Sequence, residues 1–298
     1  RWEALDTTSD AADGRLGSRS SVLTPLFHAA WKPVEGGKDQ VRLSLTRSYR
    51  APTLANLIAR RSEATGTNLE TNPDRAGNPQ LRPELATGLD LAFEHYLPAG
   101  GVLSIGVFER RIDQLIRSRT TLETVDGVSR WVSRPQNIGD AVTRGVELEA
   151  KFRLSEVVAE DAPPLEVRAN LSAFRGRVTS VSGADNRRDK QPDWSANLGG
   201  DWRVRGLPLV LGASLNFTPG YTIQLSDSQR NTVDTRRVID AYALWTFSPA
   251  LQLRLSASNL QPLDNVSSAT VTTADTRQVA TTSNPGTTAW ALRLEMKL

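Results

Sequence analysis

What the 298-residue sequence lacks already excludes several classes of protein. It contains no cysteine, which excludes disulfides, a thiolate metal site and a cysteine nucleophile. Its richest apolar run, from Leu207 to Leu215, falls far short of the ~18–20 residues that a membrane-spanning helix needs. The 36 basic and 33 acidic residues nearly balance, and no basic block interleaved with aromatic residues indicates nucleic acid as a partner. A membrane location would therefore require a closed β-barrel, which also satisfies its backbone in lipid.

The strongest pattern that is present is alternation with a period of two, which places successive side chains on opposite faces of a strand. At the chain end, one face reads Trp290, Leu292, Leu294, Met296 and Leu298, against Ala291, Arg293, Glu295 and Lys297 on the other. Similar alternation runs through residues 41–46, 146–153, 165–172 and 251–256, and weaker forms lie near 22–32, 84–96, 101–116, 192–203, 208–217 and 237–247. The pattern predicts about twelve antiparallel strands, each near the ~9–11 residues that cross a bilayer when tilted.

The connections between the predicted strands alternate in length. Short turns are predicted at residues 33–39, 98–101, 155–164, 204–208 and 248–250, and long loops at 50–83, 117–135, 178–191, 218–234 and 260–287. Short periplasmic turns opposite longer extracellular loops are typical of outer-membrane barrels. Within the first long loop, Pro52–Arg60 has helical spacing, so we expect a short helix there that packs on the rim of the barrel.

Aromatic residues lie near the ends of the predicted strands. Those beside short turns are Trp2, Trp31, Tyr96, Phe152, Trp202 and Phe247, and those towards the long loops are Tyr49, Trp194, Phe217 and Trp290. Amphipathic rings prefer the two interfaces of a membrane. A soluble β-sandwich would alternate in the same way, so the loop rhythm and the aromatic ends together favour an antiparallel transmembrane β-barrel.

Several motifs, in order along the chain, resemble the barrel of TonB-dependent outer-membrane receptors. Arg47–Leu57 resembles the family's strand leaving into an R-x-P-x-x-x-x-L loop, and Asn78–Glu84 resembles its NP-x-L-x-PE stretch. Phe108–Ile116 is similar to its F-x-x-x-I-x-x-x-I strand, and Asn137–Glu149 closely matches its N-x-x-x-A-x-x-x-G-x-E-x-E strand. Ala257–Leu260 resembles the penultimate strand running into the final loop. On this resemblance residues 1–298 are identified as the C-terminal part of such a barrel.

The resemblance implies a 22-strand barrel of which about twelve strands are present here. Family members also carry an N-terminal plug domain and a TonB-contacting box, and nothing in these residues resembles the plug. Because the chain opens at Arg1 inside an apparent strand, we expect a piece of a longer chain. One departure is the final residue, Leu298, where outer-membrane proteins usually end in an aromatic residue.

In function, the resemblance implies a receptor in the bacterial outer membrane, surrounded by outer-membrane lipid, that imports a scarce nutrient. A ferric siderophore is the first expectation, with cobalamin or another chelate as less favoured ligands. Energy would come from the inner-membrane TonB complex acting on the plug. Arginine supplies 31 of the 36 basic residues. Such side chains could attract an anionic chelate, but a general preference of the genome for arginine codons explains the excess equally well.

Few residues suggest catalysis. His28 and His95 are the only histidines and lie in separate predicted strands, and no HExxH, GxSxG or phosphate-binding loop is present. We therefore expect no catalytic residue, no metal ligand and no cofactor. A self-contained barrel that acts as an enzyme or an autotransporter-type pore stays open, and its mark would be a nucleophile beside one of the histidines. A soluble sandwich or propeller is the third alternative.

Ligand contacts are expected from the long loops and from lumen-facing residues near their bases. The candidates combine aromatic rings with polar and cationic side chains of three long loops: Trp131, Arg134, Arg187, Tyr221, Gln224 and Arg230.

Overall fold

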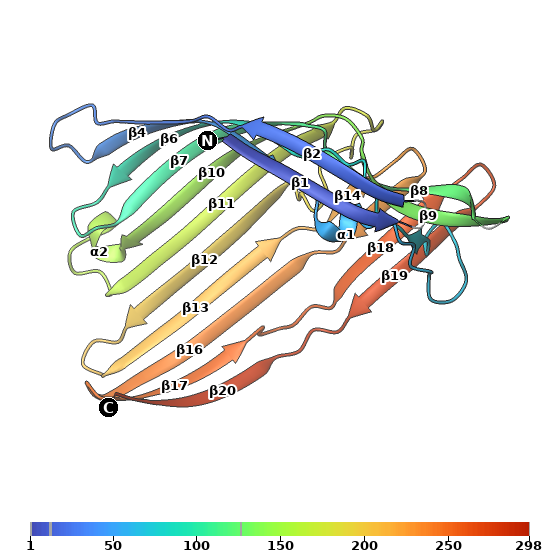
Figure 1. The fold of residues 1–298 in the computed structure, drawn as a ribbon. Coiled ribbons are helices and arrows are strands. Elements are labelled where there is room, and N and C mark those ends of the chain that lie inside the picture. Colours follow the sequence, from blue (N-terminus) through green and yellow to red (C-terminus); the bar gives the residue numbers. More distant parts are fainter. Residues whose placement is uncertain (1, 12–13, 126, 298) are drawn as a thin grey trace.

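Eleven antiparallel strands form one curved sheet that makes up most of the molecule (Figure 1). The structure, a computed structural model, describes residues 2–11, 14–125 and 127–297, so that Arg1 and Leu298 lie outside the described residues. The sheet order is β20–β17–β16–β13–β12–β11–β10–β7–β6–β4–β3. The bounds are β3 Leu26–Trp31, β4 Asp39–Arg50, β6 Glu84–Tyr96, β7 Val102–Asp113, β10 Ala141–Arg153, β11 Leu165–Val178, β12 Trp194–Arg203, β13 Leu209–Thr218, β16 Arg236–Ser248, β17 Leu251–Ser258 and β20 Ala289–Met296. The predicted all-β, antiparallel barrel fold is confirmed.

Three smaller sheets account for the remaining strands of the described residues. One pairs β1 (Trp2–Ala11) with β2 (Gly14–Leu23). The second contains β5 (Asp74–Arg75), β8 (Ile116–Val125) and β9 (Val128–Asn137), and the third contains β14 (Tyr221–Gln224), β15 (Gln229–Val233), β18 (Asn265–Thr272) and β19 (Arg277–Asn284). The segments predicted as loops at 117–135, 218–234 and 260–287 thus contain hairpins. These hairpins form small sheets apart from the main sheet, and their sequences lack the regular apolar alternation that marks its strands.

The strand predicted near residues 22–32 is interrupted in the structure. β2 ends at Leu23 and β3 begins at Leu26, with Thr24 and Pro25 between them. Proline has no N–H to donate to a strand ladder, which explains the break at this position. The carbonyl of Pro25 still accepts a hydrogen bond from the Arg47 amide at 2.9 Å, so pairing with β4 resumes at once.

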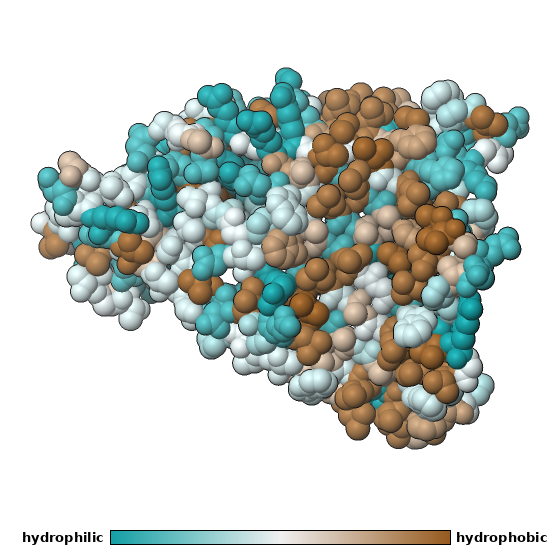
Figure 2. All heavy atoms as spheres, turned by 180° about the vertical axis from the view of Figure 1, so that it is seen from behind, coloured by the Kyte–Doolittle hydropathy of each residue, from teal (hydrophilic) through white to brown (hydrophobic). Residues whose placement is uncertain are grey.

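The main sheet has an apolar convex face and a polar concave face. Leu91, Val107 and Val146 lie opposite one another on three adjacent strands, on the convex face, and remain between 42% and 46% exposed. Figure 2 views this convex side and shows hydrophobic residues spread over the body of the sheet. On the concave face, Arg110 pairs with Asp90 at 2.5 Å and Arg42 with Glu94 at 2.7 Å. Apolar residues outside and polar residues inside are what a transmembrane barrel requires.

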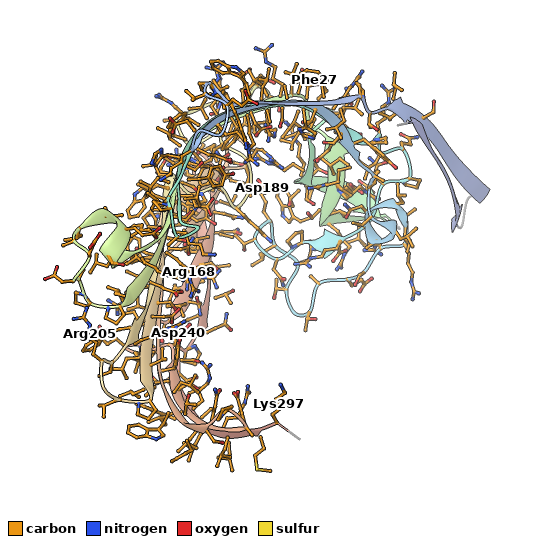
Figure 3. All side chains as sticks on the ribbon, turned by 90° about the vertical axis from the view of Figure 1, so that its left-hand side faces the viewer. Phe27, Arg168, Asp189, Arg205, Asp240 and Lys297 are labelled. Carbon is orange, nitrogen blue, oxygen red and sulfur yellow. The ribbon has the colours of Figure 1, made fainter. Side chains whose placement is uncertain are left out.

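Figure 3 shows the same division from the end of the sheet. The sheet curves as an arc with Phe27 on its convex side, whereas Asp189 lies within the concavity. Phe27 pairs with Leu45, which places both side chains on the apolar face. The long connections and the small sheets gather at one end of the strands, as predicted, and the short turns gather at the other end (Figure 1).

The predicted aromatic residues mark both ends of the strands. Trp31, Trp202 and Phe247 are exposed at the short-turn ends of β3, β12 and β16, and Trp194 and Trp290 are exposed at the loop ends of β12 and β20. The side chain of Trp2 lies outside the described part of the chain. Two belts of exposed rings separated by the length of a strand fit the two interfaces of a membrane.

The helices are short. The predicted helix within Pro52–Arg60 is present as a single turn, α1 (Leu54–Leu57), in which the Thr53 hydroxyl caps the Asn56 amide at 3.3 Å. Its Leu57 is buried, so the turn packs on the structure beneath it. α2 (Leu154–Val157) lies in a connection predicted as a turn, and its Glu156 carboxylate accepts from the Ala99 amide at 2.6 Å, which joins two neighbouring short turns. Among the described residues, no helix is both long and apolar enough to cross a membrane.

Gly145, within the strand motif of β10, leaves room for an aromatic ring on the concave face. A Cβ at this position would collide with the ring of Phe108 and lie 2.8 Å from the backbone oxygen of Ala173. We expect Gly145→Ala to destabilise the barrel by about 1–3 kcal/mol through overpacking. The midpoint of heat-induced unfolding in detergent, followed by gel mobility, measures this effect.

Gly106→Ala is the matched control for this prediction. It lies on the same face of neighbouring β7, where a Cβ would meet Ala92 at an ordinary 3.7 Å. Its unfolding midpoint should therefore match the parent protein or exceed it slightly. An equal loss of stability in both variants would show that glycine itself, rather than the room for Phe108, matters in these strands.

Candidate ligand-binding site

The motifs that carry the family resemblance meet at the root of the loops. The Asn137 side chain donates to the carbonyl oxygens of Gln114 at 2.8 Å and Arg82 at 2.9 Å, and it accepts from the Arg82 amide at 2.9 Å. The buried Glu84 carboxylate accepts from the Ile116 amide at 2.7 Å. These two side chains therefore attach the start and the end of the β8–β9 hairpin to the adjoining loop and strand.

A small hydrophobic core supports the same region. Six buried side chains from β7, β10 and β11 and the connections beside them pack together: Ile112, Leu115, Ile138, Ala141, Val178 and Val181. The core lies where the strands of the main sheet pass into the long connections. It gives the loops a rigid base, because close-packed side chains resist displacement.

Asp74 organises the first long connection, residues 50–83. Its carboxylate is fully buried and accepts from Arg61 Nη1 at 2.7 Å, Arg130 Nε at 2.6 Å, Arg130 Nη2 at 2.9 Å, the Ala64 amide at 3.0 Å and Asn68 Nδ2 at 3.2 Å. The hydrogen bonds from Arg130, with smaller contributions from Ala64 and Arg61, hold the pKa of this carboxyl well below its ordinary value despite the opposing effect of burial. Asp74 therefore ties the connection to β9 as a charged group.

Arg117 on β8 joins two other segments inside the loop end. Its side chain is only 2% exposed and donates to the carbonyl oxygens of Arg187 at 2.8 Å and Gln224 at 3.3 Å. The guanidinium also pairs with the Asp189 carboxylate at 2.8 Å. Burial lowers the pKa of Arg117, and Asp189 opposes that shift. Arg117 thus holds the β14–β15 hairpin and the 178–191 connection against β8.

A cavity of about 530 Å³ opens beside Arg117, between β8, the β14–β15 hairpin and the β18–β19 hairpin. Its wall combines charged side chains (Arg117, Asp189, Lys190), apolar or aromatic side chains (Tyr221, Ile223, Leu225, Val233) and small or hydroxylated ones (Thr71, Ser118, Ser267, Ser268, Ala269, Ala280, Thr282), together with Asn231 and Thr232. Burial raises the pKa of Tyr221, so its phenol is neutral at pH 7 and available as a hydrogen-bond donor. Mixed apolar and cationic walls suit an anionic ligand with an aromatic or aliphatic body.

A second cavity, of about 790 Å³, lies beside α1 and shares Ser118 with the first. Arg60, Arg61 and Arg75 line it. Ser118 follows Arg117 on β8, so the two cavities approach the same strand from two sides.

Among the six predicted ligand contacts, Tyr221 lines the first cavity, and Gln224, Arg230 and Arg187 lie in the segments beside it. Gln224 is buried, and its side chain accepts from Arg230 Nε at 2.5 Å and donates to the Ser226 carbonyl. Arg187 pairs with Asp193 at 2.5 Å and Asp185 at 3.3 Å. Because Arg117 donates to the carbonyls of both Arg187 and Gln224, Tyr221, Gln224, Arg187 and Arg230 lie in one neighbourhood.

The other two predicted contacts, Trp131 and Arg134, lie on β9 of the neighbouring hairpin. The Trp131 amide donates to Asn68 Oδ1 at 2.7 Å, and its carbonyl accepts from Asn68 Nδ2 at 2.9 Å. Arg134 makes a forked pair with Glu123, with Nε at 2.9 Å and Nη2 at 2.9 Å from the carboxylate, which raises the pKa of the guanidinium. Neither is among the residues that line the two cavities.

Sequence reasoning missed Arg117, Asp189, Lys190 and the Asp74 cluster. A signal for the strand that carries Arg117 was present, because Ile116–Val125 is rich in threonine and other strand-forming residues. No local pattern reveals that its side chain reaches the carbonyl of Gln224, 107 residues further along the chain.

The two histidines were expected to mark an enzyme if a nucleophile lay beside them. His28 Nδ1 lies 2.7 Å from Ser44 Oγ, and Asp90 lies opposite Ser44 on its other side, where it pairs with Arg110. A catalytic triad instead places histidine between the hydroxyl and the acid. His95 Nδ1 lies 2.7 Å from Asp39 Oδ1. Neither arrangement is that of a triad.

Residues 1–260 match the family model described as TonB dependent receptor-like, beta-barrel. The chain belongs to the TonB-dependent receptor family. This confirms the resemblance drawn from the Asn78–Glu84 and Asn137–Glu149 motifs. Receptors of this family are transport proteins of the bacterial outer membrane, not enzymes. No match was found among curated proteins.

Solved receptor structures share the fold. A ferric enterobactin receptor, PfeA, from Pseudomonas aeruginosa aligns with a TM-score of 0.63 and 17% identity over 94% of this chain and 42% of that one. The siderophore receptor PirA from Pseudomonas aeruginosa gives 0.57 and 18%, over 95% of this chain and 45% of that one. The copper transporter OprC gives 0.65 and 13%, over 96% and 42%. The chain therefore spans less than half of the length of these structures.

Proposed function

We propose that this chain, over residues 1–298, is the C-terminal part of a receptor barrel that imports a ferric siderophore or a similar scarce chelate across the bacterial outer membrane. The cavity beside Arg117 carries this proposal, because its wall offers the exposed cation of Lys190, a neutral phenol and apolar surface to an anionic chelate. The family membership and the siderophore receptors among the related folds support it.

The remainder of the receptor would close the barrel and supply the energy coupling. The main sheet has two edges, β3 and β20, and an open edge inside lipid leaves backbone groups unsatisfied. Further strands of a 22-strand barrel would cover both edges. A plug domain with a TonB box would then link the barrel to the inner-membrane TonB complex, and the ligand would meet the loop end first.

An uptake assay tests this function directly. Cells that lack the full receptor gene, and the same cells complemented with it, are grown under iron limitation and given ⁵⁵Fe-labelled catecholate and hydroxamate siderophores. We expect receptor-dependent uptake of one class, abolished when TonB is deleted. If the cells take up labelled cobalamin or copper and no iron, that ligand and not a ferric siderophore is the imported nutrient. Uptake that persists without TonB would contradict the mechanism.

Substitution of the predicted aromatic contacts locates the site. In the full receptor, Tyr221→Ala should weaken binding of the imported ferric siderophore by roughly tenfold, or about 1.4 kcal/mol, and Trp131→Ala by a smaller factor. Tyr221 lines the cavity, whereas Trp131 contributes backbone contacts to Asn68. Titration of purified receptor by tryptophan fluorescence measures the dissociation constant.

Trp202→Ala is the control for these two variants, since it removes an exposed ring at the short-turn end. All three variants should assemble as folded barrels with parent-like gel mobility. Unchanged affinity in Tyr221→Ala and Trp131→Ala would remove both residues from the site.

A further inference from the structure

Five arginines of the main sheet point outward from the convex face, in the direction of lipid. The pairing register places them in two rows across β4, β6, β7, β10 and β11. One row reads Leu45, Leu89, Glu109, Arg144 and Arg175, and the next, towards the long loops, reads Arg47, Thr87, Arg111, Val142 and Arg177. We call the five arginines the convex arginine cluster. All five are exposed.

The cluster is strongly positive. Glu109 is the carboxylate of these two rows, and it accepts from Arg111 Nε at 2.7 Å and Arg144 Nε at 2.6 Å. Five guanidinium groups and one carboxylate leave a formal charge of +4 on the two rows, and Asp113 follows one convex position further towards the loops. Arg111 and Arg144 remain more than 60% exposed despite their shared carboxylate, so their other N–H groups face outward.

An apolar groove of about 530 Å³ runs from the cluster along the convex face. Leu89, Leu91, Val107, Val146 and Ala173 line it, and Glu109, Arg144 and Arg175 lie at one end. Ala173 lies opposite Val146 on one side and Trp194 on the other, so its small side chain leaves depth between larger neighbours. The convex face thus carries an apolar groove, formed entirely by residues of this chain, with arginine side chains at one end.

The position of the cluster explains which ligand it suits. An outward arginine costs about 2–4 kcal/mol at the bilayer midplane and about 0–1 kcal/mol near the interfaces. The rows lie between the apolar part of the face and the long connections, which are extracellular in barrels of this kind. Figure 2 shows hydrophilic residues gathered towards this loop end. Arginine forks bind phosphate oxygens through paired, charge-assisted hydrogen bonds.

We propose that the convex arginine cluster and its groove form a binding site for a phosphorylated lipid of the outer leaflet. The phosphate lies on Arg111, Arg144 and Arg175, and an acyl chain lies in the groove against Leu91, Val107 and Val146. Glu109 orients two of the arginines and leaves their outer N–H groups free for the phosphate. This site is on the opposite face of the sheet from the ligand cavity and is independent of the imported nutrient.

Binding of lipopolysaccharide to the full receptor tests the site. The receptor is purified in detergent, and the dissociation constant of fluorescently labelled lipopolysaccharide is compared with that of its enzymatically dephosphorylated form. The triple variant Arg111→Gln, Arg144→Gln, Arg175→Gln should bind the intact lipid at least tenfold more weakly, and dephosphorylation should weaken binding to the parent by a similar factor. Unchanged affinity in the triple variant would overturn the proposal.

A charge-matched control separates this site from general attraction to cations. Lys32→Gln, Lys38→Gln, Arg205→Gln removes three exposed cations from the short-turn end and should leave affinity unchanged. An equal loss of lipopolysaccharide affinity in both triple variants would show that binding depends only on net charge, and it would refute a specific site. Gel mobility after mild heating confirms that each variant is folded, and the single variant Arg175→Gln, expected to lose several-fold affinity, replaces the triple variant if that one fails to assemble.

The groove has its own test. Ala173→Trp fills the apolar channel from the lipid side and should weaken lipopolysaccharide binding several-fold while the arginines remain in place. Inorganic phosphate at the concentration of the lipid should not displace it, because the phosphate lacks the acyl chain. Displacement by phosphate alone, or full affinity in Ala173→Trp, would show that the groove holds no acyl chain.

Discussion

Replacing Arg117 with leucine is expected to destabilise the packing of the loop end by about 2–3 kcal/mol. The Arg187 and Gln224 carbonyls would each lose a buried donor, at about 1–3 kcal/mol per group, while removal of a desolvated cation offsets part of that cost. Hydrogen exchange at the Gln224 amide, which donates to the Asp185 carbonyl at 2.8 Å, measures the result. A loss of 2–3 kcal/mol corresponds to roughly 30- to 150-fold lower protection.

Two companion variants sharpen this prediction. Arg117→Lys keeps the charge but lacks the planar fork that reaches both carbonyls, so it should fall between the parent and Arg117→Leu. Arg277→Leu removes an exposed arginine from β19 at the same end and should leave the Gln224 amide protected. If Arg117→Leu exchanges no faster than Arg277→Leu, the segments 178–191 and 218–234 are held together by other contacts.

Replacing Asp74 with alanine should release the first long connection. Five hydrogen bonds converge on this carboxylate, and its loss leaves two arginines facing each other without their shared anion. We expect trypsin to cleave after Arg60 or Arg61 on the order of tenfold faster or more, since cleavage requires local opening. Asp74→Asn, which keeps the shape but loses the charge, should give an intermediate rate. Cleavage as slow as in the parent would show that α1 and Leu57 hold the connection without Asp74.

The same carboxylate predicts how this connection responds to acid. The pKa of Asp74 is depressed in the folded protein, so its contribution to stability is complete above the ordinary carboxyl value of about 3.9 and is lost only as pH falls through the lower folded value. Exchange protection of the Ala64 amide should therefore be the same at pH 7 and pH 5, once intrinsic exchange rates are allowed for. A loss of protection centred between those values would contradict a depressed pKa.

The amino-acid sequence by itself determined the strands of the main sheet and the direction of their faces. Polar and apolar residues alternate in segments such as 146–153 and 165–172 because one face of a barrel strand meets lipid and the other meets water. The pattern can therefore be recognised within a single strand. The motifs that contain Glu84 and Asn137 were recognised by their resemblance to the family, whereas the hydrogen bonds of these two side chains to backbone groups at the loop junctions came from the structure.

Tertiary structure alone decided the arrangement of the loop end. The hairpins β8–β9, β14–β15 and β18–β19 show no regular apolar alternation, because the side chains that they bury, such as Arg117 and Gln224, face other loop segments, and the hairpins were predicted as loops. Arg117, Asp189 and Tyr221 come together only when segments distant in sequence fold against one another, and the convex arginines form rows only through the register of adjacent strands. A side chain's face follows from its own strand, whereas its neighbours follow from pairing and packing between segments, which no single segment encodes.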